Sequence, residues 1–103
     1  MGKLYETMQA PQLALTEKLK SYSIKPNFFE ASTIAQIYLD LKQSDSALIF
    51  FRKQLSIANA NDDDRQRMHA CNNLGYGFSE IEENDSASIY YNKALQLLAS
   101  LPN

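Results

Sequence analysis

Two segments of this chain match each other position by position. Residues 44–55 read SDSALIFFRKQL and residues 84–95 read NDSASIYYNKAL, so that Asp45 corresponds to Asp85. Both segments carry Asp-Ser-Ala, then two adjacent aromatic residues, then a lysine. A match at both the small and the large positions indicates one packing unit that the chain uses twice.

The residues before each segment repeat with the same offset. The apolar residues of the first copy have counterparts in the second: Ile34 matches Leu74, Ala35 matches Gly75, Tyr38 matches Phe78 and Leu41 matches Ile81. Apolar residues three and four positions apart form one face of a helix. The repeated unit is therefore predicted to be a helix, a short turn and a second helix, followed by a longer loop.

The ends of these helices are predicted from turn and capping residues. Pro26 disfavours helix at the residue before it, so residues 23–27 should form a break. Asn27 is a predicted N-cap with Glu30 as its reciprocal partner. The polar run 59–64, NANDDD, is predicted to be the loop between the two copies, and its acids suit the start of the next helix.

Within each copy, a second turn is predicted from the Asp-Ser-Ala segments. We expect Ser44-Asp45 and Asn84-Asp85 to form tight turns. Asp45 and Asp85 should then cap the helices that follow them, because a carboxylate at the N-cap accepts a hydrogen bond from the first helical turn.

The N-terminal segment carries a weaker helical pattern. Its apolar series is Tyr5, Met8, Leu15, Leu19 and Tyr22. Pro11 lies within this series and lacks a backbone N–H, so we expect it to begin a new helix or to kink this one. Residues 1–25 are therefore predicted to be a helical segment that acts as a degenerate repeat or a cap.

The composition is that of an ordinary globular protein. Of the 103 residues, 45% are hydrophobic and 21% charged, and the net charge is −2. There is no basic excess for a nucleic acid or an anionic membrane. No apolar run is long enough to span a bilayer, and the single cysteine cannot form an internal disulfide. We therefore expect neither nucleic-acid nor membrane partners, and a cytoplasmic location.

The sequence offers little for catalysis or metal binding. His69 and Cys71 are the only histidine and cysteine, and their spacing of two places them on different sides of one helix. Residues 62–64, DDD, resemble the start of a calcium loop, but the glycine and the closing glutamate are missing. We expect no enzyme activity, no metal and no cofactor.

The pattern of the second copy resembles the tetratricopeptide repeat (TPR). Residues 71–78, CNNLGYGF, match its Leu-Gly and aromatic positions, with Cys71 at the place of the usual tryptophan. Ala87, Tyr91 and Ala94 complete this copy. The first copy is Ala31, Ile34, Ala35, Tyr38, Ala47 and Phe51, with Gln54 where a small residue is usual.

The offset between the copies separates this chain from the usual form of the family. The usual period is about 34 residues, and the longer one seen here resembles the long-spaced subgroup found in kinesin light chain and in bacterial peptide-responsive regulators. We expect the additional residues in the loop and helix ends between copies. HEAT and armadillo repeats also have longer periods and remain the alternative, although they lack the Leu-Gly, Ala and aromatic series.

The resemblance implies an all-α fold. Antiparallel helix pairs would stack as a short right-handed superhelical array. Residues 26–60 would form the first repeat and residues 61–103 the second, as a fragment of a larger protein.

The resemblance also implies a binding groove lined by the first helix of each repeat, which holds an extended peptide or a partner helix. The expected site residues are Phe29, Ser32, Gln36 and Leu39 in the first copy, and His69, Asn72, Asn73, Tyr76 and Glu80 in the second. Asn72-Asn73 resembles the asparagine that bonds a ligand's backbone in long-spaced repeats, and an amide can both donate and accept. Tyr76 offers a large ring with a polar tip. Alternatively, these residues are only the solvated side of a helix.

The leading hypothesis is a module that binds a protein or peptide, as the interaction or sensing part of a larger, bacterial signalling protein. The alternative is a structural module that assembles as a homodimer through its last helix, with no peptide ligand. That helix stays apolar to its end, and its uncovered residues are predicted to be Ile89, Leu97, Leu98 and Leu101.

Overall fold

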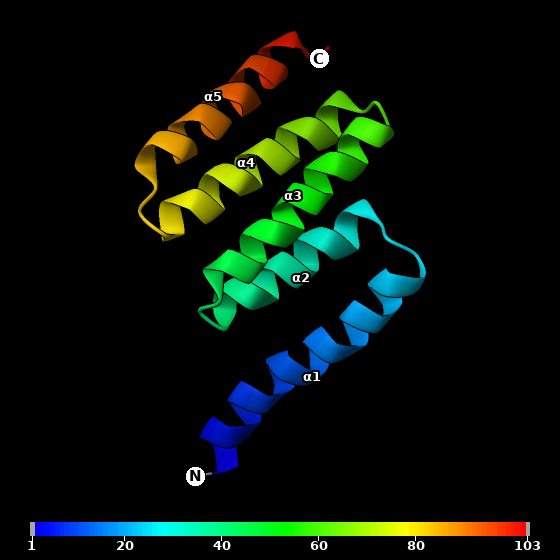
Figure 1. Ribbon diagram of the computed structural model, residues 1–103, viewed down its shortest axis with the longest axis vertical. Coiled ribbons are helices and arrows are strands. Elements are labelled where there is room, and N and C mark those ends of the chain that lie inside the picture. Colours follow the sequence, from blue (N-terminus) through cyan, green and yellow to red (C-terminus); the bar gives the residue numbers. More distant parts are fainter. Residues whose placement is uncertain (1, 103) are drawn as a thin grey trace.

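The computed structural model describes residues 2–102, with side chains from residue 11 onward, and this part of the chain is helical throughout except for short turns (Figure 1). The helices are α1 (Gly2–Ile24), α2 (Phe28–Asp40), α3 (Ser44–Ala60), α4 (Asp64–Glu80) and α5 (Asn84–Ser100). From α2 to α5, each helix runs antiparallel to the one before it and packs against it. This arrangement confirms the all-α, TPR-like array of helix pairs.

The three turns between α2 and α5 share one backbone geometry and recur at a regular interval. Each contains one residue at positive φ: Lys42 at 62°, Asp62 at 51° and Glu82 at 61°. The next backbone N–H donates to the carbonyl five residues earlier: Gln43 to Tyr38 (2.8 Å), Asp63 to Ala58 (3.2 Å) and Glu83 to Phe78 (2.9 Å). This is the Schellman motif, which satisfies carbonyl groups at a helix C-terminus.

The predicted long loop between the two copies is wrong. α3 continues to Ala60 and α4 begins at Asp64, so this connection is as short as the turns within each pair. The long period of the repeat comes instead from helix length, because α3, α4 and α5 each contain 17 residues.

Two of the helices carry side-chain N-caps. Asn27 Oδ1 accepts from the backbone N–H of Glu30 at 2.8 Å, which confirms the predicted cap of α2. The Glu30 carboxylate accepts from the Asn27 side-chain amide at 3.1 Å, so the pair is reciprocal through side chains. At α4, Asp63 caps the backbone N–H of Gln66 at 3.1 Å, as the acids of this segment indicated.

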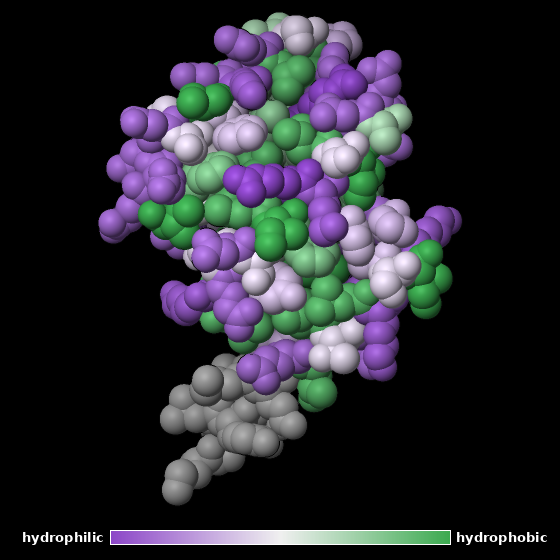
Figure 2. Space-filling model, in the orientation of Figure 1, coloured by the Kyte–Doolittle hydropathy of each residue, from purple (hydrophilic) through white to green (hydrophobic). Residues whose placement is uncertain are grey.

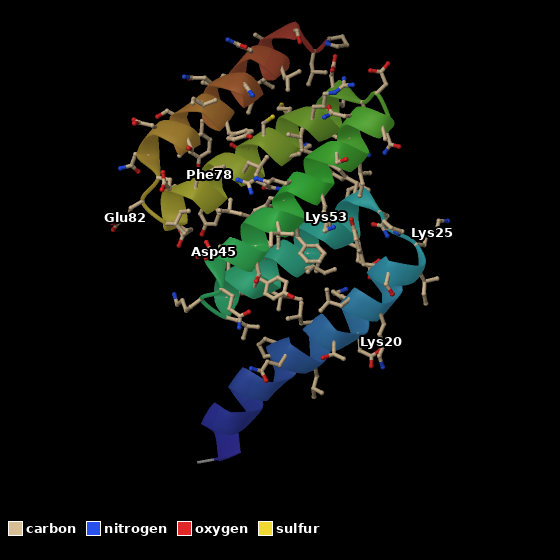
Figure 3. All side chains as sticks on the ribbon, viewed as in Figure 1. Lys20, Lys25, Asp45, Lys53, Phe78 and Glu82 are labelled. Atoms are coloured by element: carbon tan, nitrogen blue, oxygen red, sulfur yellow. The ribbon has the colours of Figure 1, made fainter. Side chains whose placement is uncertain are left out.

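The predicted caps at Asp45 and Asp85 are wrong. The N-cap positions of α3 and α5 belong to Gln43 and Glu83, whose side chains form no capping bond. Asp45 lies inside the first turn of α3 (Figure 3), and Asp85 holds the same place in α5. The reason is that each Schellman turn ends two residues earlier than the sequence suggested. The two carboxylates still favour the positive end of the helix dipole.

α1 packs against the array through its C-terminal half. Leu15, Leu19 and Tyr22 are half-buried, and the Tyr22 ring meets Phe50 of α3 edge-on at 5.5 Å between centroids. The helix continues through Pro11, so no new helix starts there. Tyr5 and Met8 lie outside the residues whose side chains are described.

The core follows the matched small and large positions of the two copies. Its main cluster is formed by Ala35, Ala47, Leu48, Phe51, Leu74, Phe78 and Ala87. A Cβ added at Gly75 would lie 2.7 Å from the Tyr91 ring, which confirms that Gly75 permits close packing. A Cβ at Gly77 would lie 2.9 Å from Leu48 Cδ2, so Gly77 permits the close approach of α4 to α3. The sequence alone offered no reason for Gly77.

The prediction that the apolar residues of α5 are uncovered is correct only in part. Ile89 and Leu98 are 54% and 55% exposed, as predicted, whereas Leu97 and Leu101 are half-buried. Leu97 faces the other side of the helix, toward Leu55 of α3 and Cys71 of α4. On the face shown in Figure 2, apolar side chains reach the surface among polar ones.

Within residues 2–102, no helix combines the length and the hydropathy needed to cross a membrane.

Candidate partner-binding surface

α2 and α4 lie side by side, and each presents one row of residues spaced by one helical turn. The α2 row is Ser32, Gln36 and Asp40, and the α4 row is Asn72, Tyr76 and Glu80. Residues at i and i+4 share one helix face. The two rows occupy the same positions of the repeat, and α2 and α4 are in direct contact. We call these six residues the paired rows.

One end of the paired rows is acidic. Tyr76 is 44% exposed, and its pKa is raised mainly by the negative charge of Glu80 and by a hydrogen bond with that carboxylate. Desolvation and the charge of Asp40 on α2 raise the pKa further. The Tyr76 hydroxyl therefore lies in the field of carboxylates from both helices, at the end where each row finishes in an acid.

Asn73 links three helices. Its Nδ2 donates to Oε1 of Gln54 on α3 at 3.0 Å and to Oγ of Ser32 on α2 at 3.5 Å. Gln54 is 1% exposed and is the buried polar side chain of the described core. Since these bonds use both hydrogens of the amide, Asn73 can offer a ligand its carbonyl oxygen as an acceptor. Sequence reasoning missed Gln54, although a polar residue at a usually small position was its signal.

His69 and Asn72 also border a second surface, an open groove of about 480 Å³ between α4 and α5. The lining residues are Met68, His69, Asn72, Tyr91, Ala94, Leu95 and Leu98. The structure therefore divides the expected site residues. Asn72 belongs to both surfaces, His69 lies at the groove, and Tyr76 and Glu80 lie in the paired rows.

A comparison with family models identifies both copies. The tetratricopeptide repeat model matches residues 32–61 and 69–97, which is more than half of the chain. The chain belongs to the TPR family. Repeats of this family mediate protein–protein interaction as non-catalytic scaffolds. No curated protein matches this sequence in a search of characterised proteins.

The TPR match decides between the helical-repeat families that share such a long period. It covers nearly all the expected site residues, from Ser32 to Glu80, and leaves Phe29 just outside. Phe29 is 75% exposed, with its ring edge-on to Phe28 at 5.3 Å. Leu39 is half-buried and packs against the main core cluster. Of these two, Phe29 is the side chain that is free to meet a partner.

The acidic segment 62–64 of this TPR chain serves the turn and the start of α4. Arg67 pairs with Asp62 at 2.8 Å and with Asp64 at 2.6 Å, while Asp63 caps the helix. Among the described residues, no three His, Cys, Asp or Glu side chains gather as metal ligands do. Each carboxylate of the segment thus has a local role in the fold.

Cys71 and His69 do not form a reactive pair. Cys71 is buried, and burial raises the pKa of its thiol, which disfavours the reactive thiolate. His69 is exposed and borders the α4–α5 groove, whereas Cys71 borders a different depression with Leu55 and Leu97. The two side chains therefore face different surroundings.

Proposed function

We propose that this TPR chain binds an extended segment of a partner protein along the paired rows of α2 and α4. The observation that carries the proposal is the register of the rows: Ser32, Gln36 and Asp40 recur as Asn72, Tyr76 and Glu80 on the neighbouring helix. A surface that repeats its chemistry from helix to helix suits a chain that runs across both helices. Asn73, held by Gln54, would accept a hydrogen bond from the backbone of that segment.

The charge of the rows indicates what the segment should carry. Both rows end in a carboxylate, and the central positions are uncharged. A lysine or arginine of the ligand would meet Asp40 and Glu80, and its cation would lie near the Tyr76 ring. A ligand carboxylate at this end would be repelled. We also propose that the chain serves as the interaction or sensing part of a larger signalling protein. The sequences of the peptides that it binds would identify the partner in that signalling process.

Selection of peptides tests this proposal. The chain is immobilised, a library of random linear peptides is displayed, and the enriched peptides are measured on variants by fluorescence anisotropy. We expect basic peptides, and Tyr76→Ala should weaken them about tenfold or more, as the loss of an aromatic anchor does. Ile49→Ala is the control, since Ile49 is 51% exposed on α3. Enriched peptides that bind Tyr76→Ala as tightly as the wild-type chain would refute the site.

A further inference from the structure

The paired rows continue by one more turn at the N-terminal ends of α2 and α4. Phe29 and His69 lie three residues before the first residue of each row, and residues at i and i+3 share one helix face. Because each helix from α2 onward runs antiparallel to the one before it, α2 and α4 point in the same direction (Figure 1). Phe29 and His69 therefore lie at one end of the surface, and Asp40 and Glu80 lie at the other.

The first end is apolar at Phe29. Its ring is 75% exposed and meets Phe28 edge-on, while Phe28 itself is buried with Ala58 and Ala70. One side of the exposed ring is thus supported by the core, and the rest is open to solvent. His69 is also exposed but borders the α4–α5 groove. An apolar ligand side chain placed against Phe29 would remove apolar surface of both partners from water.

The second end carries negative charge that the chain leaves uncompensated. Asp40 and Glu80 are exposed, and neither forms an ion pair among the side chains described from residue 11 onward. The last turns of α2 and α4 contain no basic residue. Lys42, in the turn after α2, borders a depression at the start of α3 together with Asp45. The C-terminal ends of both helices add partial negative charge, so this end favours a cation.

The two rows stay close to each other between these ends. Near the apolar end, Asn73 on α4 donates to Ser32 on α2 at 3.5 Å. Near the acidic end, Asp40 on α2 is close enough to Tyr76 on α4 for its charge to raise the pKa of the hydroxyl. A single ligand can therefore contact both helices along the whole length of the rows.

The length of the surface sets the spacing of the ligand's anchors. Phe29 and Asp40 are eleven positions apart on α2, which corresponds to about 16 Å along the helix axis. An extended chain advances about 3.3 Å per residue, and its side chains alternate between two faces. Anchors that point to the same face and span this length are therefore about four or six positions apart, with the flexible stem of a basic residue making up the difference.

We propose that the extended segment bound on the paired rows has two unlike anchors, an apolar side chain against Phe29 and a lysine or arginine at Asp40 and Glu80, four or six positions from each other. This inference rests on the function proposed above and adds the apolar anchor and the spacing. The partner is thus a protein with an exposed linear segment that combines one large apolar residue with one basic residue, rather than a uniformly basic tail.

A selection with one fixed residue tests the spacing. Displayed linear peptides carry a single arginine with about seven random positions on each side, and they are selected on the wild-type chain, on Phe29→Ala and on Ile89→Ala. Ile89 is the matched control, because it is 54% exposed on α5 and lies outside the paired rows. We expect Leu, Ile, Phe or Trp to be enriched four or six positions from the arginine on the wild-type chain and on Ile89→Ala, and not on Phe29→Ala.

Fluorescence anisotropy measures the apolar contact directly. The most enriched peptide is synthesised with its apolar residue and with serine at that position. The serine peptide should bind the wild-type chain about tenfold more weakly, whereas the two peptides should bind Phe29→Ala almost equally, because the side chain that they contact is already missing. Circular dichroism checks that Phe29→Ala and Ile89→Ala keep their helices.

The outcomes separate this inference from the function on which it rests. Enriched peptides that are weakened by Tyr76→Ala, but that show no apolar residue at either spacing or keep the same one on Phe29→Ala, would overturn the inference alone. A failure to enrich any peptide on the wild-type chain would overturn both. Light scattering that shows a concentration-dependent dimer abolished by Phe29→Ala would also overturn both, because the surface would then hold a second copy of this chain.

Discussion

The helix pairs α2–α3 and α4–α5 share one sequence pattern but differ in what covers them. On α3, the outward side chains Leu48 and Phe51 are 5% and 0% exposed because α4 lies over them. On α5, the counterpart of Phe51 is Tyr91, which is only half-buried. The repeat pattern therefore determines which residues point outward, and the presence of a neighbouring helix determines whether these residues are buried.

The sharpest way to break this comparison is to truncate the matched aromatic residues. Phe51→Ala should destabilise the chain by about 3–5 kcal/mol, because it empties a fully buried site. Tyr91→Ala should cost less, about 1–2 kcal/mol, since its side chain is only partly buried. Urea denaturation followed by circular dichroism measures both. Equal losses would mean that α5 is covered as fully as α3.

Enlarging the matched small residues should instead have the same effect in both copies. Ala47 and Ala87 are 0% and 5% exposed in one core cluster. A leucine at either place overpacks the core and should destabilise by roughly 1–3 kcal/mol. Thermal unfolding of the two variants tests this expectation. An unchanged melting temperature for Ala87→Leu would contradict the assigned role of this position.

The amide network joins the first pair to α4 through Asn73, and the second pair has Ala94 at the position of Gln54, so removing the network sharpens the contrast. Gln54→Leu takes away the acceptor for Asn73 and should cost about 1–2 kcal/mol. In a double-mutant cycle with Asn73→Leu, we expect a coupling of about 1 kcal/mol. Additive losses, measured by chemical denaturation, would show that the two amides act independently.

The smallest expected effect lies in the turns and should be equal in both pairs. Lys42 and Glu82 hold positive φ angles that disfavour any residue with a Cβ. Lys42→Gly and Glu82→Gly should each stabilise by about 0.5–1 kcal/mol, since glycine adopts this conformation without steric cost. Differential scanning calorimetry resolves the shift in Tm. A loss of stability in either variant would contradict the assigned turn geometry.

The fold could be predicted from the sequence because the residues that recur in the repeat are the ones that pack between helices. Small residues such as Ala35 and Gly75, and large ones such as Phe51, recur wherever two helices meet. The turns were harder to predict. Lys42, Asp62 and Glu82 give no glycine or proline signal, so the predicted loop and caps were displaced along the chain.

The candidate site was predicted in part. The register of the paired rows follows from helix spacing, so Gln36 and Tyr76 were expected at the surface and are exposed. The use of Asn73 inside the fold was not foreseen, because its partner Gln54 lies 19 residues earlier on another helix. Gly77 could not be explained from the sequence for the same reason, because the side chain that it approaches, Leu48, lies on another helix, α3.

The three equal turns have a consequence for how such a chain can change length. From α2 to α5 the turn geometry repeats with every helix, whereas the side-chain pattern repeats with every second helix. Adding or deleting a single helix with its turn would keep the turn geometry. The paired-row residues on one side of the change would then lie on the opposite face of the array from those on the other side. Only steps of two helices keep the paired rows aligned, so this architecture grows and shrinks by even numbers.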